Sequence, residues 1–271
     1  MNKGNILAGL DVGHINTKTV LMRGQEILGY STASTGFDVV AAAQTALNHA
    51  LDSVGISGDE LVGIVATGIF RDRMKGPPLN VNRTVPEYVA DAKGALFLNE
   101  NSRTVIDIGG NIHKAVHYDQ NGSLLDVIQN DKCADGLGIF YTTIAKAVGV
   151  SEEELSELAL KSTQHVSVAI HCAASAESEA IDLMCQGMDI ADVADAISRF
   201  IGERVAAMCT AMSLAQEIVV AGGLAKSKAL MKHLQSLLKQ DVSVLNLPEY
   251  VGAIGAVICL EKSQNSSNID W

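Results

Sequence analysis

A short pattern occurs twice in this chain and limits the folds that the chain can adopt. Asp11-Val-Gly13 is followed by Lys18, and Asp107-Ile-Gly109 is followed by Lys114, with the same internal spacing and an offset of 96 residues between equivalent positions. In each copy an apolar, β-rich run leads into the aspartate, and a second such run contains the lysine. The pattern predicts an internal duplication of a strand, turn, strand unit.

Short strands and longer helices are expected around the two copies. β-rich runs bounded by glycines or polar residues predict strands at 6–10, 17–22, 26–30, 61–66, 104–110, 114–118 and 217–223. Apolar residues at helical spacing predict helices at 39–54, 87–98, 133–148, 151–161, 173–186, 189–214, 226–238 and 251–261. Asn121-Gly122 predicts a hairpin turn, and segment 68–85, which contains Pro77 and Pro78, is expected to be a loop.

The length agrees with a duplicated architecture. At about 150 residues per domain, 271 residues correspond to nearly two domains. We expect a first lobe at 1–100, a second lobe at 101–262 and a mobile polar tail at 263–271, with helix 249–261 packing back on the first lobe. Because hydrophobic residues make up 48% of the chain and aromatic residues only 4%, the core is expected to be aliphatic.

The charge of the chain argues against two classes of partner. Lys and Arg total 20 against 31 Asp and Glu, which gives a net charge of -11. Nucleic acids and anionic membranes both attract basic surfaces, so neither is an expected partner. The longest apolar stretch, 251–260, is shorter than a membrane span, and Asp11 interrupts the apolar run near the N-terminus. The expected location is the cytoplasm.

Three glycine turns carry the strongest chemical signal. Gly13, the Gly109-Gly110 pair and the Gly222-Gly223 pair each close an apolar strand, where a residue without a Cβ lets backbone N–H groups approach a phosphate. Asp11 and Asp107 would place carboxylates beside these turns, which suits a hydrated Mg²⁺ bound to phosphate oxygens. The alternative is three tight turns without a ligand. No Walker sequence and no Gly-x-Gly-x-x-Gly after the first strand is present.

The five cysteines are odd in number and widely spaced, which does not suit a disulfide framework. Cys133 and Cys172 are expected at helix N-termini, where the helix dipole favours a thiolate and an anionic cluster. Cys185, Cys209 and Cys259 lie in apolar helical stretches and are expected to be buried thiols. A zinc site at His171 and Cys172 is a weaker hypothesis, because adjacent residues rarely bind one metal.

The duplicated hairpins and the late Gly-Gly turn resemble the actin, sugar-kinase and heat-shock chaperone superfamily. This resemblance implies an α/β, actin-like ATPase (ribonuclease H-like) fold with two similar lobes around a nucleotide cleft. In more detail, the chain resembles the activator ATPases of 2-hydroxyacyl-CoA dehydratases and the ATPase subunits of benzoyl-CoA reductase. The matching stretches are 9–13 with Lys18, 65–68, 92–95, 105–110, 130–134, Cys172 with 176–179, 221–225 and 252–256.

The resemblance implies a site and its cofactors. Asp11 and Asp107 are the expected catalytic residues, acting with ATP or ADP and Mg²⁺. The expected nucleotide-binding residues are Gly13, His14, Asn16, Thr17, Lys18, Gly109, Gly110, Asn111, Lys114, Gly222 and Gly223. Cys133 and Cys172 from two chains would supply four thiolates to one [4Fe–4S] cluster per dimer.

The implied partners follow from the same resemblance. They are a second copy of the chain or a sister ATPase subunit, and a ferredoxin or flavodoxin as electron donor. The electron acceptor would be an iron–sulfur dehydratase or an aromatic acyl-CoA reductase. In the family ATP changes the angle between the cluster-bearing helices, and a low-potential electron passes to that acceptor.

Departures from the family pattern leave two alternatives open. The second turn usually continues Gly-Gly-Gln-Asp-x-Lys, whereas Asn111-Ile-His113 stands here, and the first turn reads His14-Ile-Asn-Thr17 instead of small hydroxyl residues. A nucleotide-binding regulatory subunit with little turnover is therefore one alternative. A small-molecule kinase of the same superfamily, with Asp135 as general base, is the other.

Overall fold

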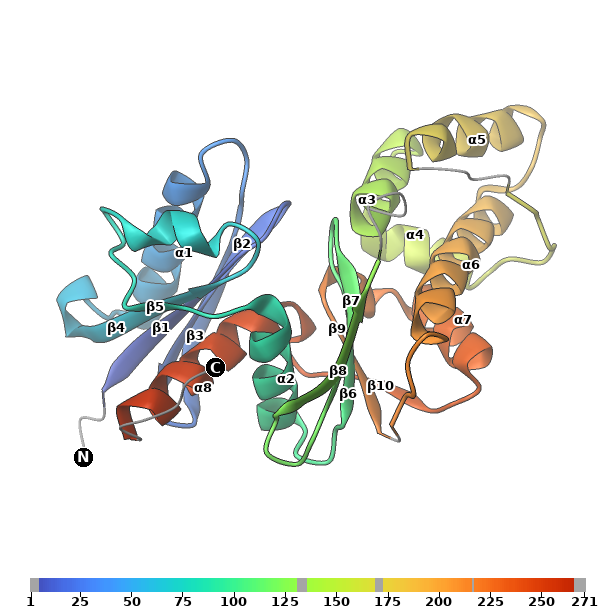
Figure 1. Cartoon of the computed structure of the whole chain (residues 1–271). Coiled ribbons are helices and arrows are strands. Elements are labelled where there is room, and N and C mark those ends of the chain that lie inside the picture. Colours follow the sequence, from blue (N-terminus) through green and yellow to red (C-terminus); the bar gives the residue numbers. More distant parts are fainter. Residues whose placement is uncertain (1–4, 131–135, 169–172, 216, 266–271) are drawn as a thin grey trace. The chain divides into compact units, whose positions relative to one another are not determined.

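The structure is a computed structural model that describes residues 5–130, 136–168, 173–215 and 217–265 (Figure 1). The chain forms two compact units. Unit 1 comprises Met1–Asn101, Tyr118–Leu124 and Glu249–Trp271, and unit 2 comprises Ser102–His117 and Leu125–Pro248. Each unit contains a five-stranded sheet.

The sheet of unit 1 has the strand order β3-β2-β1-β4-β5. β1 (Ile6–Val12), β2 (Asn16–Arg23) and β3 (Glu26–Ser34) form an antiparallel meander. β4 (Leu61–Thr67) runs parallel to β1, and the two-residue β5 (Arg83–Thr84) runs parallel to β4. The meander is the first copy of the strand, turn, strand unit.

Helices cover both faces of this sheet (Figure 1). α1 (Val39–Val54) packs on one face, where Ala43 and Leu47 belong to the same buried cluster as Leu10. α8 (Val251–Asn265) packs on the other face, and α2 (Glu87–Leu98) lies against α8. α1 begins where the Asp38 carboxylate accepts hydrogen bonds from two backbone N–H groups, and it ends at Gly55, which is left-handed.

The sheet of unit 2 repeats the arrangement of unit 1. Its order is β10-β9-β6-β7-β8, in which β6 (Thr104–Ile108) is antiparallel to β7 (His113–Tyr118), and β8 (Leu124–Gln129) lies beside β7. β9 (Ile218–Ala221) is parallel to β6, and β10 (Val242–Val244) is parallel to β9. The predicted duplication is therefore confirmed at the level of topology.

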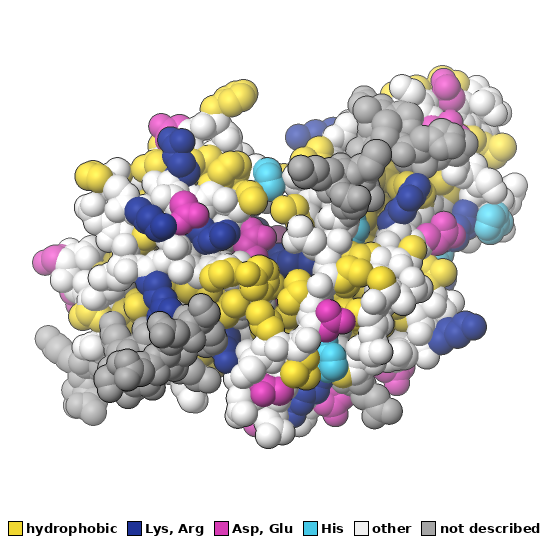
Figure 2. All heavy atoms as spheres, in the orientation of Figure 1, with side chains coloured by type: hydrophobic (Ala, Val, Ile, Leu, Met, Phe, Trp, Pro, Cys, Tyr) yellow, Lys and Arg dark blue, Asp and Glu magenta, His cyan; other side chains and the backbone are white. Residues whose placement is uncertain are grey.

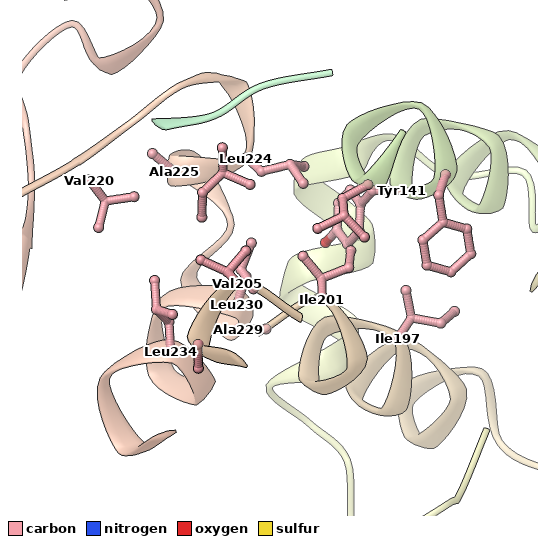
Figure 3. Close-up of a cluster of buried hydrophobic side chains, with 14 of the residues drawn as sticks. Tyr141, Ile197, Ile201, Val205, Val220, Leu224, Ala225, Ala229, Leu230 and Leu234 are labelled. Atoms are coloured by element: carbon pink, nitrogen blue, oxygen red, sulfur yellow. The ribbon is translucent and has the colours of Figure 1, made fainter. Parts of the chain in front are cut away.

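The described part of unit 2 contains five α-helices: α3 (Leu137–Ala147), α4 (Glu152–Ala159), α5 (Ala173–Cys185), α6 (Ile190–Cys209) and α7 (Lys228–Leu238). Their apolar faces meet one side of the sheet in an aliphatic core that includes Ile201, Val220 and Leu230 (Figure 3). The predicted aliphatic core is thus confirmed, with Tyr141 and Phe140 as its few aromatic members.

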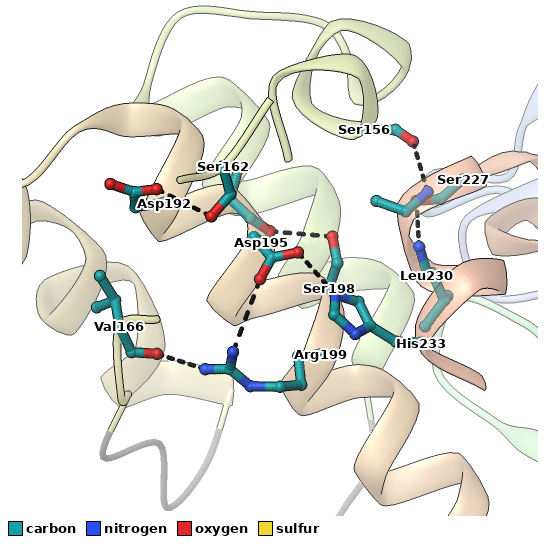
Figure 4. A network of polar contacts seen from close by, with 12 residues as sticks. Ser156, Ser162, Val166, Asp192, Asp195, Ser198, Arg199, Ser227, Leu230 and His233 are labelled. Atoms are coloured by element: carbon teal, nitrogen blue, oxygen red, sulfur yellow. Dashed lines mark hydrogen bonds and ion pairs between the residues drawn. The ribbon is translucent and has the colours of Figure 1, made fainter. Parts of the chain in front are cut away.

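A polar network fastens α6 to its neighbours (Figure 4). The Asp192 carboxylate accepts hydrogen bonds from the backbone N–H groups of Thr163 and Gln164 at 2.8 and 2.9 Å, and these bonds lower the pKa of Asp192. One turn along, Asp195 lies 2.7 Å from the His233 ring on α7. The network joins α6 both to the segment after α4 and to α7.

Several sequence predictions need correction. The structure adds β8 and β10, which the strand pattern missed, and places a 3₁₀ helix at Arg71–Lys75 and β5 inside the predicted loop. Cys185 is exposed, because it lies at the end of α5, whereas Cys209 and Cys259 are buried as predicted.

Two further observations concern the helices and the charged side chains. No helix in the described ranges is long and apolar enough to cross a membrane. Acidic and basic side chains are interspersed on the face shown in Figure 2.

Candidate functional site

In unit 1 the first predicted turn joins β1 to β2. Asp11 and Lys18 face each other across these strands, and the Lys18 ammonium lies 3.5 Å from the Asp11 carboxylate. The N–H of Gly13 donates to the carbonyl of Asn16 at 3.3 Å, which closes the turn. A Cβ on Gly13 would lie 3.8 Å from the Lys18 Nζ. The structure therefore brings Asp11, Gly13 and Lys18 together.

Two other predicted residues of this turn have contacts of their own. The exposed His14 ring packs edge-on against Phe70, with 5.3 Å between the ring centroids. Thr17 is fully buried, and its hydroxyl lies 2.9 Å from the Thr35 hydroxyl. The Thr17 side chain therefore points into the protein and connects the start of β2 to the residue that follows β3.

A second carboxylate in unit 1 was missed by the sequence analysis. Asp91 on α2 is only 5% exposed. A Cβ on Gly252 of α8 would lie 3.4 Å from Asp11 Oδ2 and 3.5 Å from Asp91 Oδ1, so both carboxylates face the same glycine. In the sequence, Asp91 stands out only as an acidic residue among the alanines of segment 87–98. Its proximity to Asp11 becomes visible only through the contact of both carboxylates with Gly252 of α8.

In unit 2 the predicted residues converge more tightly. Lys114 Nζ donates to Asp107 Oδ2 at 2.6 Å, and the Gly109 N–H donates to the Ile112 carbonyl at 3.1 Å. Gly222 has a φ of 87°, and a Cβ there would lie 2.4 Å from Asp107 Oδ1. Glycine is required at this position by backbone conformation and by space. Nothing lies within 4 Å of a Cβ on Gly223, so the second glycine of the pair is open.

A buried histidine lies next to this turn. His113 is 1% exposed, and its Nδ1 has no hydrogen-bond partner among the described residues. Burial lowers the pKa of His113 to about 4, although the negative charge of Asp107 opposes the shift. The imidazole is therefore neutral at physiological pH. The sequence analysis noted His113 only as a departure from the family motif.

The two turns offer the same set of groups. Each has one carboxylate, one ammonium and a glycine turn, in which the N–H of the first glycine closes the turn. Carboxylate oxygens suit Mg²⁺, while ammonium and N–H groups suit phosphate oxygens. The residues of each turn, taken by itself, therefore fit a magnesium ion and phosphate oxygens.

Comparison with known proteins decides the family. The model of the BadF/BadG/BcrA/BcrD ATPase family matches residues 8–259. The chain belongs to this family. The (R)-2-hydroxyglutaryl-CoA dehydratase activating ATPase of Acidaminococcus fermentans is 30% identical over 251 residues, which cover 92% of this chain and 95% of that protein.

Solved structures of family members agree with the fold. Component A of the A. fermentans (R)-2-hydroxyglutaryl-CoA dehydratase has a TM-score of 0.89 at 29% identity, covering 97% of this chain and all of that one. The activator of the 2-hydroxyisocaproyl-CoA dehydratase from Clostridium difficile, solved with bound ADPNP, has a TM-score of 0.87 at 27% identity, covering 98% and 100%. The actin-like ATPase fold expected from the resemblance is confirmed.

The two cysteines that this family resemblance singles out, Cys133 and Cys172, lie outside the described residues. Within the described ranges, no group of three or more His, Cys, Asp or Glu side chains is placed to hold a metal ion.

Proposed function

We propose that this family member is an ATP-dependent activator that delivers low-potential electrons to an iron–sulfur acyl-CoA dehydratase. The observation that carries the proposal is the repeated turn, in which an aspartate and a lysine pair beside a glycine in each unit. The names of the similar proteins support the choice of a dehydratase as partner. An aromatic acyl-CoA reductase would be the acceptor if dehydratases give no response.

Each turn residue has a role in binding nucleotide. Asp11 and Asp107 are the carboxylates that would hold a hydrated Mg²⁺, and the ion would supply positive charge that favours phosphate binding. Lys18 and Lys114 donate to phosphate oxygens, together with backbone N–H groups of the Gly13 and Gly109-Gly110 turns. Gly222 packs directly against Asp107, and the open space beside Gly223 would leave room for the nucleotide.

Hydrolysis requires charge stabilisation more than covalent chemistry. As water attacks the γ-phosphoryl group, the bond to the ADP oxygen breaks and negative charge moves onto that leaving oxygen, where the ammonium groups of Lys18 and Lys114 would stabilise it. A bound Mg²⁺ would supply further positive charge, and Asp11 and Asp107 would orient the water molecules around it. The proton of the attacking water passes to the phosphate product or to solvent as the new bond to phosphorus forms.

Cys133 and Cys172 would hold half of a [4Fe–4S] cluster, with the same two cysteines of a second copy or of a sister subunit completing it. The cluster supplies one-electron chemistry at low potential, with a ferredoxin or flavodoxin as donor. A nucleotide that binds two conformations unequally shifts their populations, which can change the surroundings of the cluster.

Anaerobic purification and metal analysis test this proposal. We expect about two irons per chain, as one four-iron cluster per dimer requires. Cys133→Ser and Cys172→Ser should abolish iron binding, whereas Cys185→Ser, which removes an exposed thiol, should retain it. A colourless wild-type protein that still lacks iron after cluster reconstitution would overturn the proposal.

A nucleotide-binding subunit with little turnover is the second candidate. The second turn has Ile112 where the family usually has an acidic residue, and its neighbour His113 is buried and neutral. Steady-state ATPase activity near that of the A. fermentans activating ATPase would exclude this candidate. Tight nucleotide binding without turnover, and gain of turnover in Ile112→Asp, would support it.

A further inference from the structure

An open groove in unit 2 lies between α7 and β10, the edge strand of the sheet. It has a volume of about 730 Å³. Its lining includes Lys226, Lys228 and Lys232, together with Met231 from α7 and Val244 from β10. Among the described residues that line the groove there is no carboxylate. The groove is therefore basic, although the net charge of the chain is -11.

Two of the lysines belong to one face of α7. Lys228, Met231, Lys232 and Gln235 have the i, i+3, i+4, i+7 spacing that brings residues together on a helix surface. Lys228 and Lys232 are exposed, and Gln235 donates a hydrogen bond to the Asp241 carboxylate at 3.1 Å. We call Lys228, Met231 and Lys232 the lysine stripe. It offers two positive charges, one helical turn apart, beside an apolar side chain.

β10 directs backbone groups away from its neighbour β9. The Leu245 N–H donates to the Val220 carbonyl at 3.2 Å, and Val244 is the residue that is aligned with Val220. Because bonding residues alternate along a parallel strand, the N–H and C=O groups of Val242 and Val244 point to the outer side of β10. β10 is the last strand of the described sheet, and Val244 is 45% exposed. Such an edge is a template for a further strand.

A strand added to β10 would also lie beside the lysine stripe. Val242 packs against the core that the helices cover, and Val244 lines the groove, so both side chains are on the α7 side of the sheet. Every second side chain of an added strand would project to this side, at intervals of about 7 Å. Residues four apart on a helix are separated by about 6 Å. Two acidic side chains at alternate positions therefore match Lys228 and Lys232.

We propose that the β10 edge and the lysine stripe bind an extended acidic segment of a partner protein, which adds to the sheet as a further strand. Backbone hydrogen bonds to β10 supply affinity, and the two lysines select acidic side chains at alternate positions of the segment. A nucleic acid fits this surface less well, because a long polyanion extends beyond the groove and meets the negative charge of the whole chain.

The first test probes the charges with a fluorescein-labelled ten-residue peptide in which glutamate and valine alternate. Fluorescence anisotropy measures its binding to the full chain. We expect the double variant Lys228→Glu/Lys232→Glu to weaken binding by at least about tenfold, because two ion pairs become two repulsions. Lys161→Glu makes the same charge change at an exposed position outside the groove and should stay within about twofold of wild type. A peptide with lysine in place of glutamate should not bind.

The second test probes the backbone and uses only wild-type protein. Two forms of the peptide are N-methylated, one at every valine and the other at every glutamate. In an added strand the N–H groups that face β10 all belong to one of these two sets. We therefore expect one form to lose at least about tenfold in affinity, while the other stays within about threefold of the unmodified peptide.

Four results would overturn the inference. They are unchanged peptide binding in the double variant, loss of affinity in both N-methylated forms, loss in neither form, and displacement of the peptide by an equal concentration of inorganic triphosphate, which would indicate a general anion site. Sedimentation velocity tests a second copy of the chain as the occupant. Changed self-association of the double variant with unchanged peptide binding would assign the groove to that copy and also overturn the inference.

Discussion

The two aspartate–lysine pairs are not equivalent. In unit 2 the 2.6 Å contact is a charge-assisted hydrogen bond that fixes one oxygen of Asp107, while the Gly222 backbone approaches the other oxygen. In unit 1 the 3.5 Å separation leaves Asp11 and Lys18 as a looser ion pair. Asp107 is therefore the better fixed of the two carboxylates, and Asp11 has more freedom to adjust to a ligand.

His113 should make the protein sensitive to acid. Burial lowers its pKa in the folded protein to about 4, whereas an unfolded histidine titrates near 6.5. Between these values the unfolded chain binds more protons, so the free energy of unfolding decreases as the pH falls. Because of this histidine we expect the free energy of unfolding to decrease by about 2 kcal/mol between pH 7 and pH 5, and we expect His113→Val to remove this decrease. Urea unfolding at both pH values measures it.

His49→Gln is the control for this experiment, since it removes an exposed imidazole from α1. Equal changes of the pH dependence in both variants would show that the position of the imidazole does not matter, and would contradict the assignment to burial.

Gly222 and Gly223 should tolerate alanine very differently. A Cβ on Gly222 would meet both Asp107 Oδ1 and the Ile108 carbonyl at 2.4 Å, on a backbone with a φ of 87°. We expect Gly222→Ala to lower the free energy of unfolding by about 2–4 kcal/mol. Gly223→Ala, with open space around its Cβ, should change it by less than about 0.5 kcal/mol. Chemical unfolding followed by circular dichroism compares them; similar losses would contradict the steric argument.

Among the helices and strands, the sequence predicts the ones whose buried apolar side chains recur at a regular spacing. The strands ending at Asp11 and Asp107 and the long helices have such patterns and were found. β10 and β5 have only three and two residues, too few for a period, and β8 reads Leu-Leu-Asp-Val-Ile-Gln with most of its residues exposed. These strands form because a neighbouring strand offers backbone hydrogen bonds. The position of that neighbour depends on the tertiary structure, so the local sequence does not predict them.

The same distinction applies to the candidate site. Asp11, Gly13, Lys18 and their repeats were predictable because adjacent strands bring residues of fixed spacing together. Asp91 was not, because its place near Asp11 depends on the packing of α2 against α8.

The contact between α2 and α8 should depend on glycine. A Cβ on Gly255 would lie 1.7 Å from the Ala90 carbonyl oxygen, so the helices cross at backbone contact. Alanine usually stabilises a helix by up to about 1 kcal/mol over glycine. We nevertheless expect Gly255→Ala to destabilise unit 1 by about 3 kcal/mol, because the helices must separate. The measurement is thermal unfolding by calorimetry.

Gly252 on the same helix provides the comparison. Its Cβ would lie 3.4 Å from the nearest atom, an ordinary contact distance. Gly252→Ala should therefore leave stability unchanged or raise it slightly. Destabilisation of the two variants by equal amounts would mean that helix packing does not explain the glycine at 255.

At the scale of the whole molecule, the question is whether both copies of the repeat contribute to nucleotide binding. Both units contain the same strand order and the same aspartate–glycine–lysine set, but a duplicated fold can persist with a single working copy. The two possibilities differ in how many aspartates control magnesium-dependent nucleotide binding. A ligand that binds the folded state raises its stability by mass action, so unfolding reports on this binding directly.

We expect Mg–ADP at a hundredfold excess over its dissociation constant to stabilise the wild-type protein by about 2.7 kcal/mol. If one Mg–nucleotide complex is held by both units, Asp11→Asn and Asp107→Asn should each lose most of this stabilisation at the same ligand concentration. Asp52→Asn, which neutralises an exposed carboxylate on α1, should retain it. Differential scanning calorimetry with Mg–ADP, and with ADP in the presence of a chelator, separates the magnesium-dependent part. A carboxylate that contributes to binding of the ion cannot be replaced by an amide without loss of affinity for the Mg–nucleotide complex. Full stabilisation of Asp11→Asn by Mg–ADP would therefore confine the site to unit 2 and show that the first copy has only a structural role.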